Sequence, residues 1–98
     1  MESFSDIVSK EPLVLVDFFA TWCQPCKMMH PVLEQLKGEM GDGLRILKVD
    51  VDKNEALSAQ FRIQSVPTLV LFRGGEQVWR QSGAMSLAAL KQVINGSF

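Results

Sequence analysis

Short apolar runs alternate with segments of helical spacing along most of this chain. Runs that are apolar on both faces, such as LVLVDFFA, are typical of strands covered by helices on both sides. Gly74 and Gly75 separate two runs and predict a tight hairpin, so the last two strands should be antiparallel. We therefore expect four strands, at residues 13–20, 44–51, 68–73 and 76–81, and the one at 44–51 should be a second buried strand.

Helical segments surround these strands, and the pattern predicts them at residues 3–9, 25–40, 52–61 and 86–94. In the longest, Met29, Leu33 and Leu36 recur at the spacing of one apolar stripe. Asp52 followed by Glu55 resembles a capping box at the start of the third helix. The alternating order predicts one α/β domain over residues 1–98, with helices on both faces of a mixed central sheet.

Composition narrows the function classes. With 98 residues, 21% of them charged, and a net charge of -1, the chain has none of the excess of basic residues expected of a nucleic-acid-binding protein. It contains no apolar run of 18 residues, so we expect no membrane-spanning helix. Residues 1–11 lack the apolar core of a secretory signal. These features predict a cytoplasmic protein without nucleic-acid or membrane partners.

The candidate chemistry centres on the only two cysteines, Cys23 and Cys26, which join the end of a strand to the start of a helix. A disulfide between them would close a very small ring and add little stability, which favours a chemical role. The partial positive charge of a helix N-terminus stabilises a thiolate, so we expect an exposed Cys23 sulfur with a lowered pKa. Cys23 is then the nucleophile, and Cys26, on the same helix face, the resolving thiol.

Another interpretation of the pair is metal binding. A structural zinc site takes four ligands, and His30 is the only further ligand close in sequence. A metal- or cluster-bridged dimer would need the same residues from a second chain. We therefore favour a site with no metal and no cofactor.

Asp17 is the only polar residue in the run from Leu13 to Ala20, and strand alternation places it on the face that also carries Leu15 and Phe19. Burial of a carboxylate is costly and raises its pKa. Because Asp17 precedes the cysteine segment by a few residues, it could accept the proton of Cys26. Lys48, in the neighbouring strand, is the expected cationic partner. The alternative is a purely structural buried ion pair.

Taken together, these residues resemble the thioredoxin family. The stretch VDFFATWCQPCK at residues 16–27 carries the likeness, and KVDVD at 48–52, VPT at 66–68 and GA at 83–84 follow in the family's order. They span nearly the whole chain. The resemblance implies a thioredoxin fold and a protein-disulfide reductase that works through a Cys23–Cys26 dithiol/disulfide couple.

The resemblance also implies a substrate site. Val66-Pro67 looks like the family's cis-proline loop facing the cysteines, although residue types alone favour a trans bond. An extended substrate segment would pair with this backbone by β-addition. The implied partners are disulfide-containing proteins and an NADPH-dependent thioredoxin reductase as electron donor, with the chain itself a monomer. The implied substrate-binding residues are Trp22, Gln24, Pro25, Val66, Pro67, Gly83 and Ala84.

Three departures from the family pattern stand out. Gln24 stands where these proteins usually have Gly, and Phe19 where many have Trp. Only two residues precede Ser3, so we expect the family's N-terminal edge strand to be absent or vestigial, leaving an open sheet edge. Two other functions remain open at this point: a non-catalytic binding module that uses the same groove, and an oxidase or isomerase that differs in redox potential.

Overall fold

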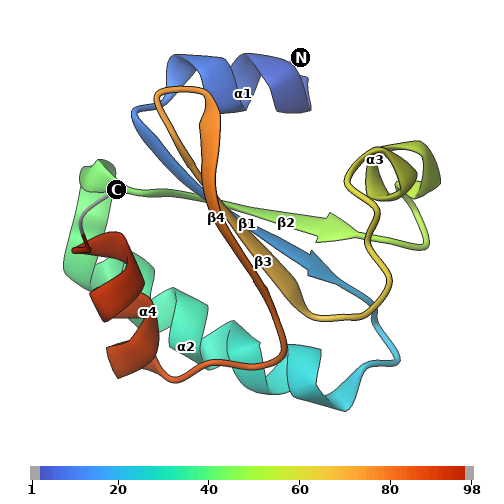
Figure 1. Ribbon diagram of the computed structural model, residues 1–98. Coiled ribbons are helices and arrows are strands. Elements are labelled where there is room, and N and C mark those ends of the chain that lie inside the picture. Colours follow the sequence, from blue (N-terminus) through green and yellow to red (C-terminus); the bar gives the residue numbers. More distant parts are fainter. Residues whose placement is uncertain (1–2, 97–98) are drawn as a thin grey trace.

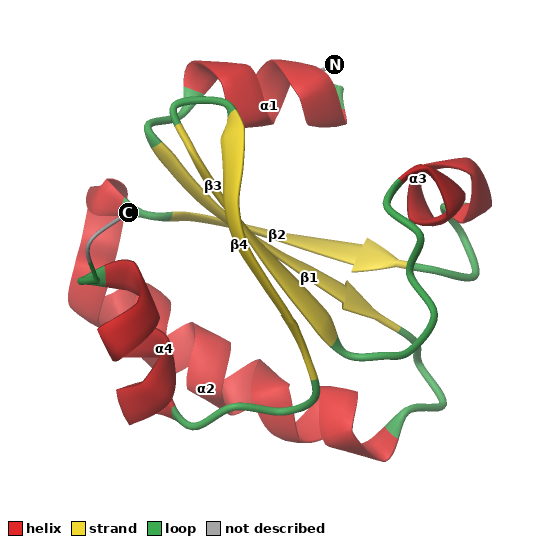
Figure 2. Ribbon diagram, in the orientation of Figure 1, coloured by secondary structure: helices red, strands yellow, loops and turns green. Residues whose placement is uncertain are grey.

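The computed structural model describes residues 3–96, in which helices and strands alternate as the hydrophobic pattern predicts (Figures 1 and 2). The boundaries agree with the predicted ones to within a few residues. The helices and strands are α1 (Phe4–Lys10), β1 (Leu13–Phe19), α2 (Gln24–Met40), the short 3-10 helix η1 (Gly41–Gly43), β2 (Arg45–Asp50), α3 (Glu55–Gln60), β3 (Thr68–Arg73), β4 (Glu76–Ser82) and α4 (Leu87–Ile94).

The strands form one mixed sheet in the order β2-β1-β3-β4. β1 is parallel to β2 and antiparallel to β3, and β4 returns antiparallel beside β3. Figure 1 shows α2 and α4 together on one side of the strands, with α1 and α3 on the other. The α/β class, the four strands and the helices on both faces are confirmed.

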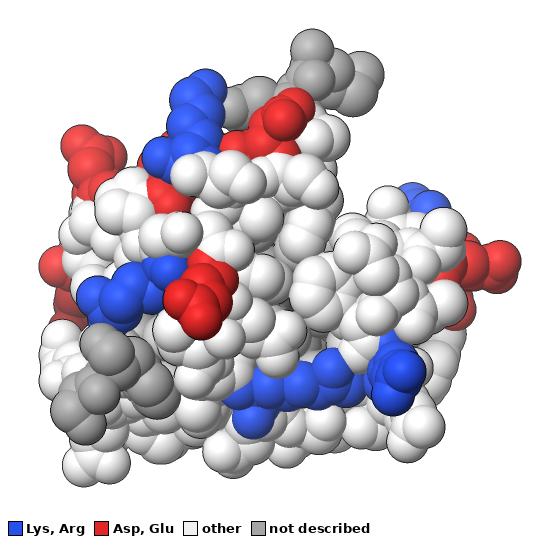
Figure 3. Space-filling model, turned by 45° about the horizontal axis from the view of Figure 1, so that its top comes forward, with Lys and Arg blue, Asp and Glu red and all other residues white. Residues whose placement is uncertain are grey.

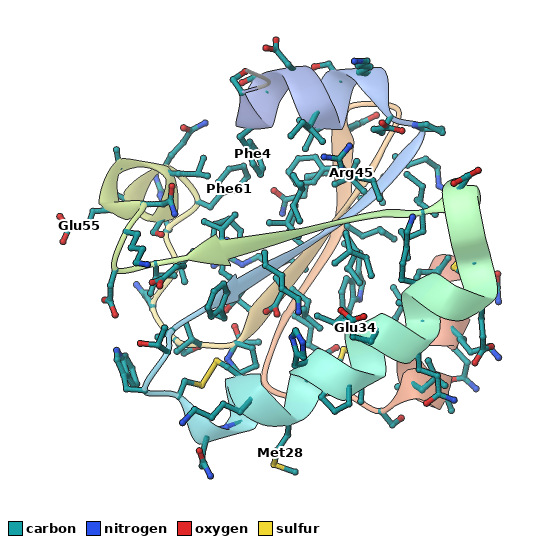
Figure 4. All side chains as sticks on the ribbon, turned by 180° about the vertical axis from the view of Figure 1, so that it is seen from behind. Phe4, Met28, Glu34, Arg45, Glu55 and Phe61 are labelled. Atoms are coloured by element: carbon teal, nitrogen blue, oxygen red, sulfur yellow. A yellow bond between two sulfur atoms is a disulfide. The ribbon has the colours of Figure 1, made fainter. Side chains whose placement is uncertain are left out.

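Two apolar layers hold the helices on the sheet, and strand alternation assigns the side chains of β1 to them. Leu13 and Leu15 pack with the α2 and α4 residues, including Leu33 and Leu90. The opposite face of β1 packs against α1 and α3. There the rings of Phe4 and Phe61 meet edge to face with centroids 5.4 Å apart, which Figure 4 shows between the two helices.

Two predictions about local structure are wrong. The strand at 44–51 is not the buried strand that was expected, because β2 lies at the edge of the sheet formed by the described residues and most of its residues are only partly buried. Asp52 and Glu55 form no capping box, since α3 begins after Asn54 and no side chain caps it. The capping box that does occur joins Ser3 and Asp6 at the start of α1.

The N-terminal edge strand is absent from the residues that the structure describes, where α1 is the first element; Met1 and Glu2 lie outside them. As a result β2 has a partner strand on one side only within residues 3–96. None of the described helices is both long and apolar enough to cross a membrane. On the face drawn in Figure 3, basic and acidic side chains are scattered among larger uncharged areas.

Candidate active site

Cys23 and Cys26 are joined by a disulfide at the N-terminus of α2, with their Cα atoms 5.3 Å apart. Cys23 is the N-cap residue, and its Sγ accepts a hydrogen bond from the backbone N–H of Cys26 at 3.2 Å. Pro25 lies in the first turn, where its missing N–H costs no helical hydrogen bond. The chain therefore places one sulfur at the positive end of a 17-residue helix.

Cys23 is less open to solvent than the sequence suggests. Cys23 is 4% exposed and Cys26 is 6% exposed, so the expectation of an exposed Cys23 sulfur is wrong for this disulfide form. The pair packs in a small apolar cluster with Ala20, against which Val66 also packs. The neighbouring Gln24 and Pro25, by contrast, are exposed.

Trp22 forms the rim beside the cysteines and is 69% exposed. Its Nε1 donates a hydrogen bond to Oδ2 of Asp52 at 2.9 Å, which ties the indole to the segment after β2. Trp22 and Val66 line one shallow hollow of about 160 Å³. Sequence reasoning missed the other residues that line this hollow, Val51 and residues 63–65.

The loop before β3 faces the disulfide. The Val66-Pro67 peptide bond is cis, as the family resemblance implied. The carbonyl oxygen of Val66 lies 3.5 Å from Cys23 Sγ, and that of Pro67 accepts a hydrogen bond from the N–H of Gly83 at 2.8 Å. Gly83 has a φ of 101°, a conformation that glycine adopts without strain. Ala84 follows it and is exposed.

Asp17 lies on the α2 face of the sheet and lines a cavity together with Cys26. It is 3% exposed, and its Oδ1 has no hydrogen-bond partner among residues 3–96. Burial raises the pKa of Asp17 to about 6, although the nearby charge of Lys48 opposes the rise. Asp17 and Cys26 line the same open cavity of about 480 Å³, whose other charged or titratable residues are Lys27, His30 and Lys48.

Lys48 does lie beside Asp17, because the two residues are register partners in β1 and β2. It is, however, exposed on the edge strand, and its Nζ contacts Nδ1 of His30. No direct ion pair between Lys48 and Asp17 occurs in the part of the chain that the structure describes. Sequence reasoning considered His30 only as a metal ligand. No group of three or more potential metal ligands lies together within residues 3–96.

Comparison with known proteins identifies this arrangement. The family model "Thioredoxin" matches residues 1–96. The chain belongs to the thioredoxin family. It is 46% identical over 94 residues to the thioredoxin of Bacillus subtilis, covering 96% of this chain and 89% of that protein. Over 93% of this chain and 84% of the other, the structure matches mitochondrial thioredoxin 3 of Saccharomyces cerevisiae in its oxidised form, with a TM-score of 0.85 and 34% identity.

Another thioredoxin-family relative is the bifunctional thioredoxin reductase/thioredoxin of Mycobacterium leprae, 48% identical over 87 residues. The alignment covers 89% of this chain but only 19% of that longer protein. The family and the cysteine pair together make this chain a protein-disulfide oxidoreductase of the thioredoxin type, and members of the family are protein-disulfide reductases.

Proposed function

We propose that this protein is a single thioredoxin domain that reduces disulfide bonds in other proteins, with Cys23 as the attacking sulfur and Cys26 as the resolving one. The observation that carries the proposal is the Cys23–Cys26 disulfide at the start of α2. Cys23 Sγ already accepts the N–H of Cys26 there. The same N–H, together with the helix dipole, would stabilise a Cys23 thiolate once the disulfide is reduced.

The proposed reaction transfers two electrons in two displacements. The Cys23 thiolate attacks one sulfur of the substrate disulfide, forming a mixed disulfide and releasing the other substrate sulfur as a thiolate. Cys26 then loses its proton and attacks Cys23 Sγ, so the second substrate sulfur also leaves as a thiolate. The substrate gains two thiols, and the protein ends in the disulfide form described above.

Asp17 is the proposed acceptor of the Cys26 proton. Its carboxyl group shares a cavity with Cys26, and the pKa of about 6 lets it take up a proton near neutral pH. Because Oδ1 has no hydrogen-bond partner among the described residues, the oxygen is free to accept. The cavity is large enough to hold water, which could relay the proton. The positive charge of Lys48 is proposed to limit the rise in the pKa of Asp17, so that the carboxylate form is populated near neutral pH.

Substrates are proposed to dock as an extended segment across the rim. Val66, half-buried beside Cys23, and Trp22 line the hollow that would take an apolar side chain. The backbone around Pro67 offers the β-addition edge, which the Gly83 hydrogen bond holds in place. Exposed Gln24, Pro25 and Ala84 would contact the substrate at the periphery.

An electron donor must return the disulfide to the dithiol. We propose an NADPH-dependent thioredoxin reductase, because one relative carries a thioredoxin reductase and a thioredoxin in one chain, as its name states. We further propose that the chain acts as a monomer in the cytoplasm, in electron transport that maintains the cellular thiol balance. The proposal includes no metal and no cofactor bound to this chain.

The decisive experiment separates the roles of the two cysteines. Reduction of a disulfide-bonded protein substrate is followed with a recycling reductant for the wild type, Cys23→Ser and Cys26→Ser. We expect both variants to lose turnover, and only Cys26→Ser to accumulate a covalent mixed disulfide on non-reducing gels. Full turnover by Cys23→Ser, or a mixed disulfide trapped on Cys26 instead, would refute the proposal.

A further inference from the structure

His30 makes a contact that neither the proposed reaction nor the family likeness accounts for. It lies one helical turn after Cys26 on α2 and lines the same cavity as Asp17. Its Nδ1 contacts the Nζ of Lys48, which belongs to β2 and lines the same cavity. The contact thus bridges α2 and the open edge strand at the mouth of the cavity that leads to Asp17.

The chemistry of this contact fixes the state of the imidazole. A lysine ammonium has three donors and no acceptor, so Nδ1 must accept and the ring proton must be on Nε2. Nε2 lies 4.0 Å from Oε1 of Glu34, beyond hydrogen-bond distance but on the side of that carboxylate. Figure 4 shows Glu34 extending from α2 on the side of the helix that faces the sheet. His30 therefore has one acceptor, and Lys48 occupies it.

The position of Lys48 matters because Asp17 responds to it. Desolvation raises the pKa of Asp17 to about 6, and the Lys48 charge is the influence that lowers it. Register places the two residues side by side in the neighbouring strands β1 and β2. In the structure the ammonium instead contacts His30, and Asp17 Oδ1 has no partner among the described residues.

We propose that His30 is a positioning residue that holds the Lys48 ammonium at the mouth of the cavity and away from the Asp17 carboxylate. Lys48 is exposed on an edge strand and has a long flexible side chain, so without His30 it is free to fold inward onto Asp17. A direct ion pair favours the charged carboxylate and makes Asp17 a weaker base. The kinetic consequence of this shift rests on the proposed role of Asp17 as proton acceptor.

The test is a carboxyl NMR titration of Asp17 in the full, oxidised chain, where the disulfide prevents Cys26 from titrating. Lys27, His30 and Lys48 are the remaining charged or titratable residues that line the cavity with Asp17. His30→Ala removes the acceptor, while His30→Asn keeps an oxygen at the position of Nδ1. We expect His30→Ala to lower the Asp17 midpoint by about one pH unit, the lower end for a newly formed close ion pair. His30→Asn should stay close to the wild type.

Repeating the titration in the Lys48→Met protein shows whether Lys48 causes the shift of the Asp17 midpoint. In Lys48→Met, the change His30→Ala should leave the Asp17 midpoint unmoved. An unchanged or raised midpoint in His30→Ala alone, or an equal shift in the Lys48→Met background, would overturn the inference. The titration needs no turnover. It therefore decides the role of His30 even if the cysteine variants refute the proposed function.

Discussion

Trp22 and Asp52 are joined by a hydrogen bond of 2.9 Å between residues 30 positions apart in the sequence. The bond connects the residue before the active-site disulfide to the segment that follows β2. Most of the Trp22 side chain is exposed, so packing alone does not fix the ring. The Asp52 carboxylate thus sets the orientation of the largest apolar surface at the proposed docking site.

Removing this carboxylate should impair substrate reduction more than folding. In Asp52→Ala the indole loses the hydrogen bond that orients it at the rim, and a bound substrate then has to fix the orientation of the ring. We expect kcat/KM for a disulfide-bonded protein to fall by roughly 2- to 10-fold, the equivalent of one net hydrogen bond. Asp52→Asn keeps an acceptor and should retain most of the rate. Asp42→Ala, in exposed η1, is the matched control. Wild-type kinetics for Asp52→Ala would contradict this role.

The active-site elements could be predicted from sequence because their signals are local. The apolar run of β1, Pro25 in the first turn of α2 and the two cysteines all lie within residues 13–26. The positions of Asp17 and Cys26 around one cavity follow from strand alternation and helix geometry. The Gly74-Gly75 turn likewise determined how β4 pairs with β3.

Other features depend on contacts between distant segments and therefore escaped prediction. Asp52 has the spacing of a capping residue, but its side chain is bonded to Trp22 instead. The run 44–51 is apolar enough for a buried strand, yet no strand covers the outer side of β2 within residues 3–96. The low exposure of Cys23 results from packing with Ala20 and with Val66, which is 43 residues away. None of these relationships is encoded in a short window of sequence.

Two glycine-to-alanine changes should have opposite effects on stability. A Cβ at Gly83 meets no atom within 4 Å, so its cost is the backbone strain of φ 101° alone. We expect Gly83→Ala to lower the free energy of unfolding by about 1–2 kcal/mol. Gly38 lies within α2, also in open space, and Gly38→Ala should raise stability by about 0.5–1 kcal/mol. Urea unfolding of both variants tests the pair, and a gain for Gly83→Ala would contradict it.

If Asp17 accepts the Cys26 proton, the second displacement should depend on pH in a defined way. The pKa of Asp17 is about 6, so the rate of mixed-disulfide resolution should rise with pH up to about that value and then level off. Asp17→Asn should remove this rise and slow resolution by about 100-fold at neutral pH, the low end for loss of a general base. Stopped-flow measurement of substrate thiol release gives the rate. Retention of the wild-type profile in Asp17→Asn would exclude Asp17 as the base.

The same buried carboxyl group should make stability depend on pH. Burial raises the pKa of Asp17 from 3.8 to about 6, so the folded state binds its proton more tightly than the unfolded state. The protonated form is therefore the stable one, and stability should fall as pH rises from about 4 to about 6. The difference between the two pKa values corresponds to about 3 kcal/mol lost above that range.

Asp17→Asn removes the charge while keeping the shape of the side chain. Its free energy of unfolding should match that of the wild type near pH 4 and exceed it by up to about 3 kcal/mol above pH 6. Denaturant unfolding of the oxidised proteins at several pH values measures this difference. Asp42→Asn serves as the control, because that carboxylate is exposed and its removal relieves no burial. A stability difference between Asp17→Asn and the wild type that is constant across pH would show that burial does not raise the Asp17 pKa.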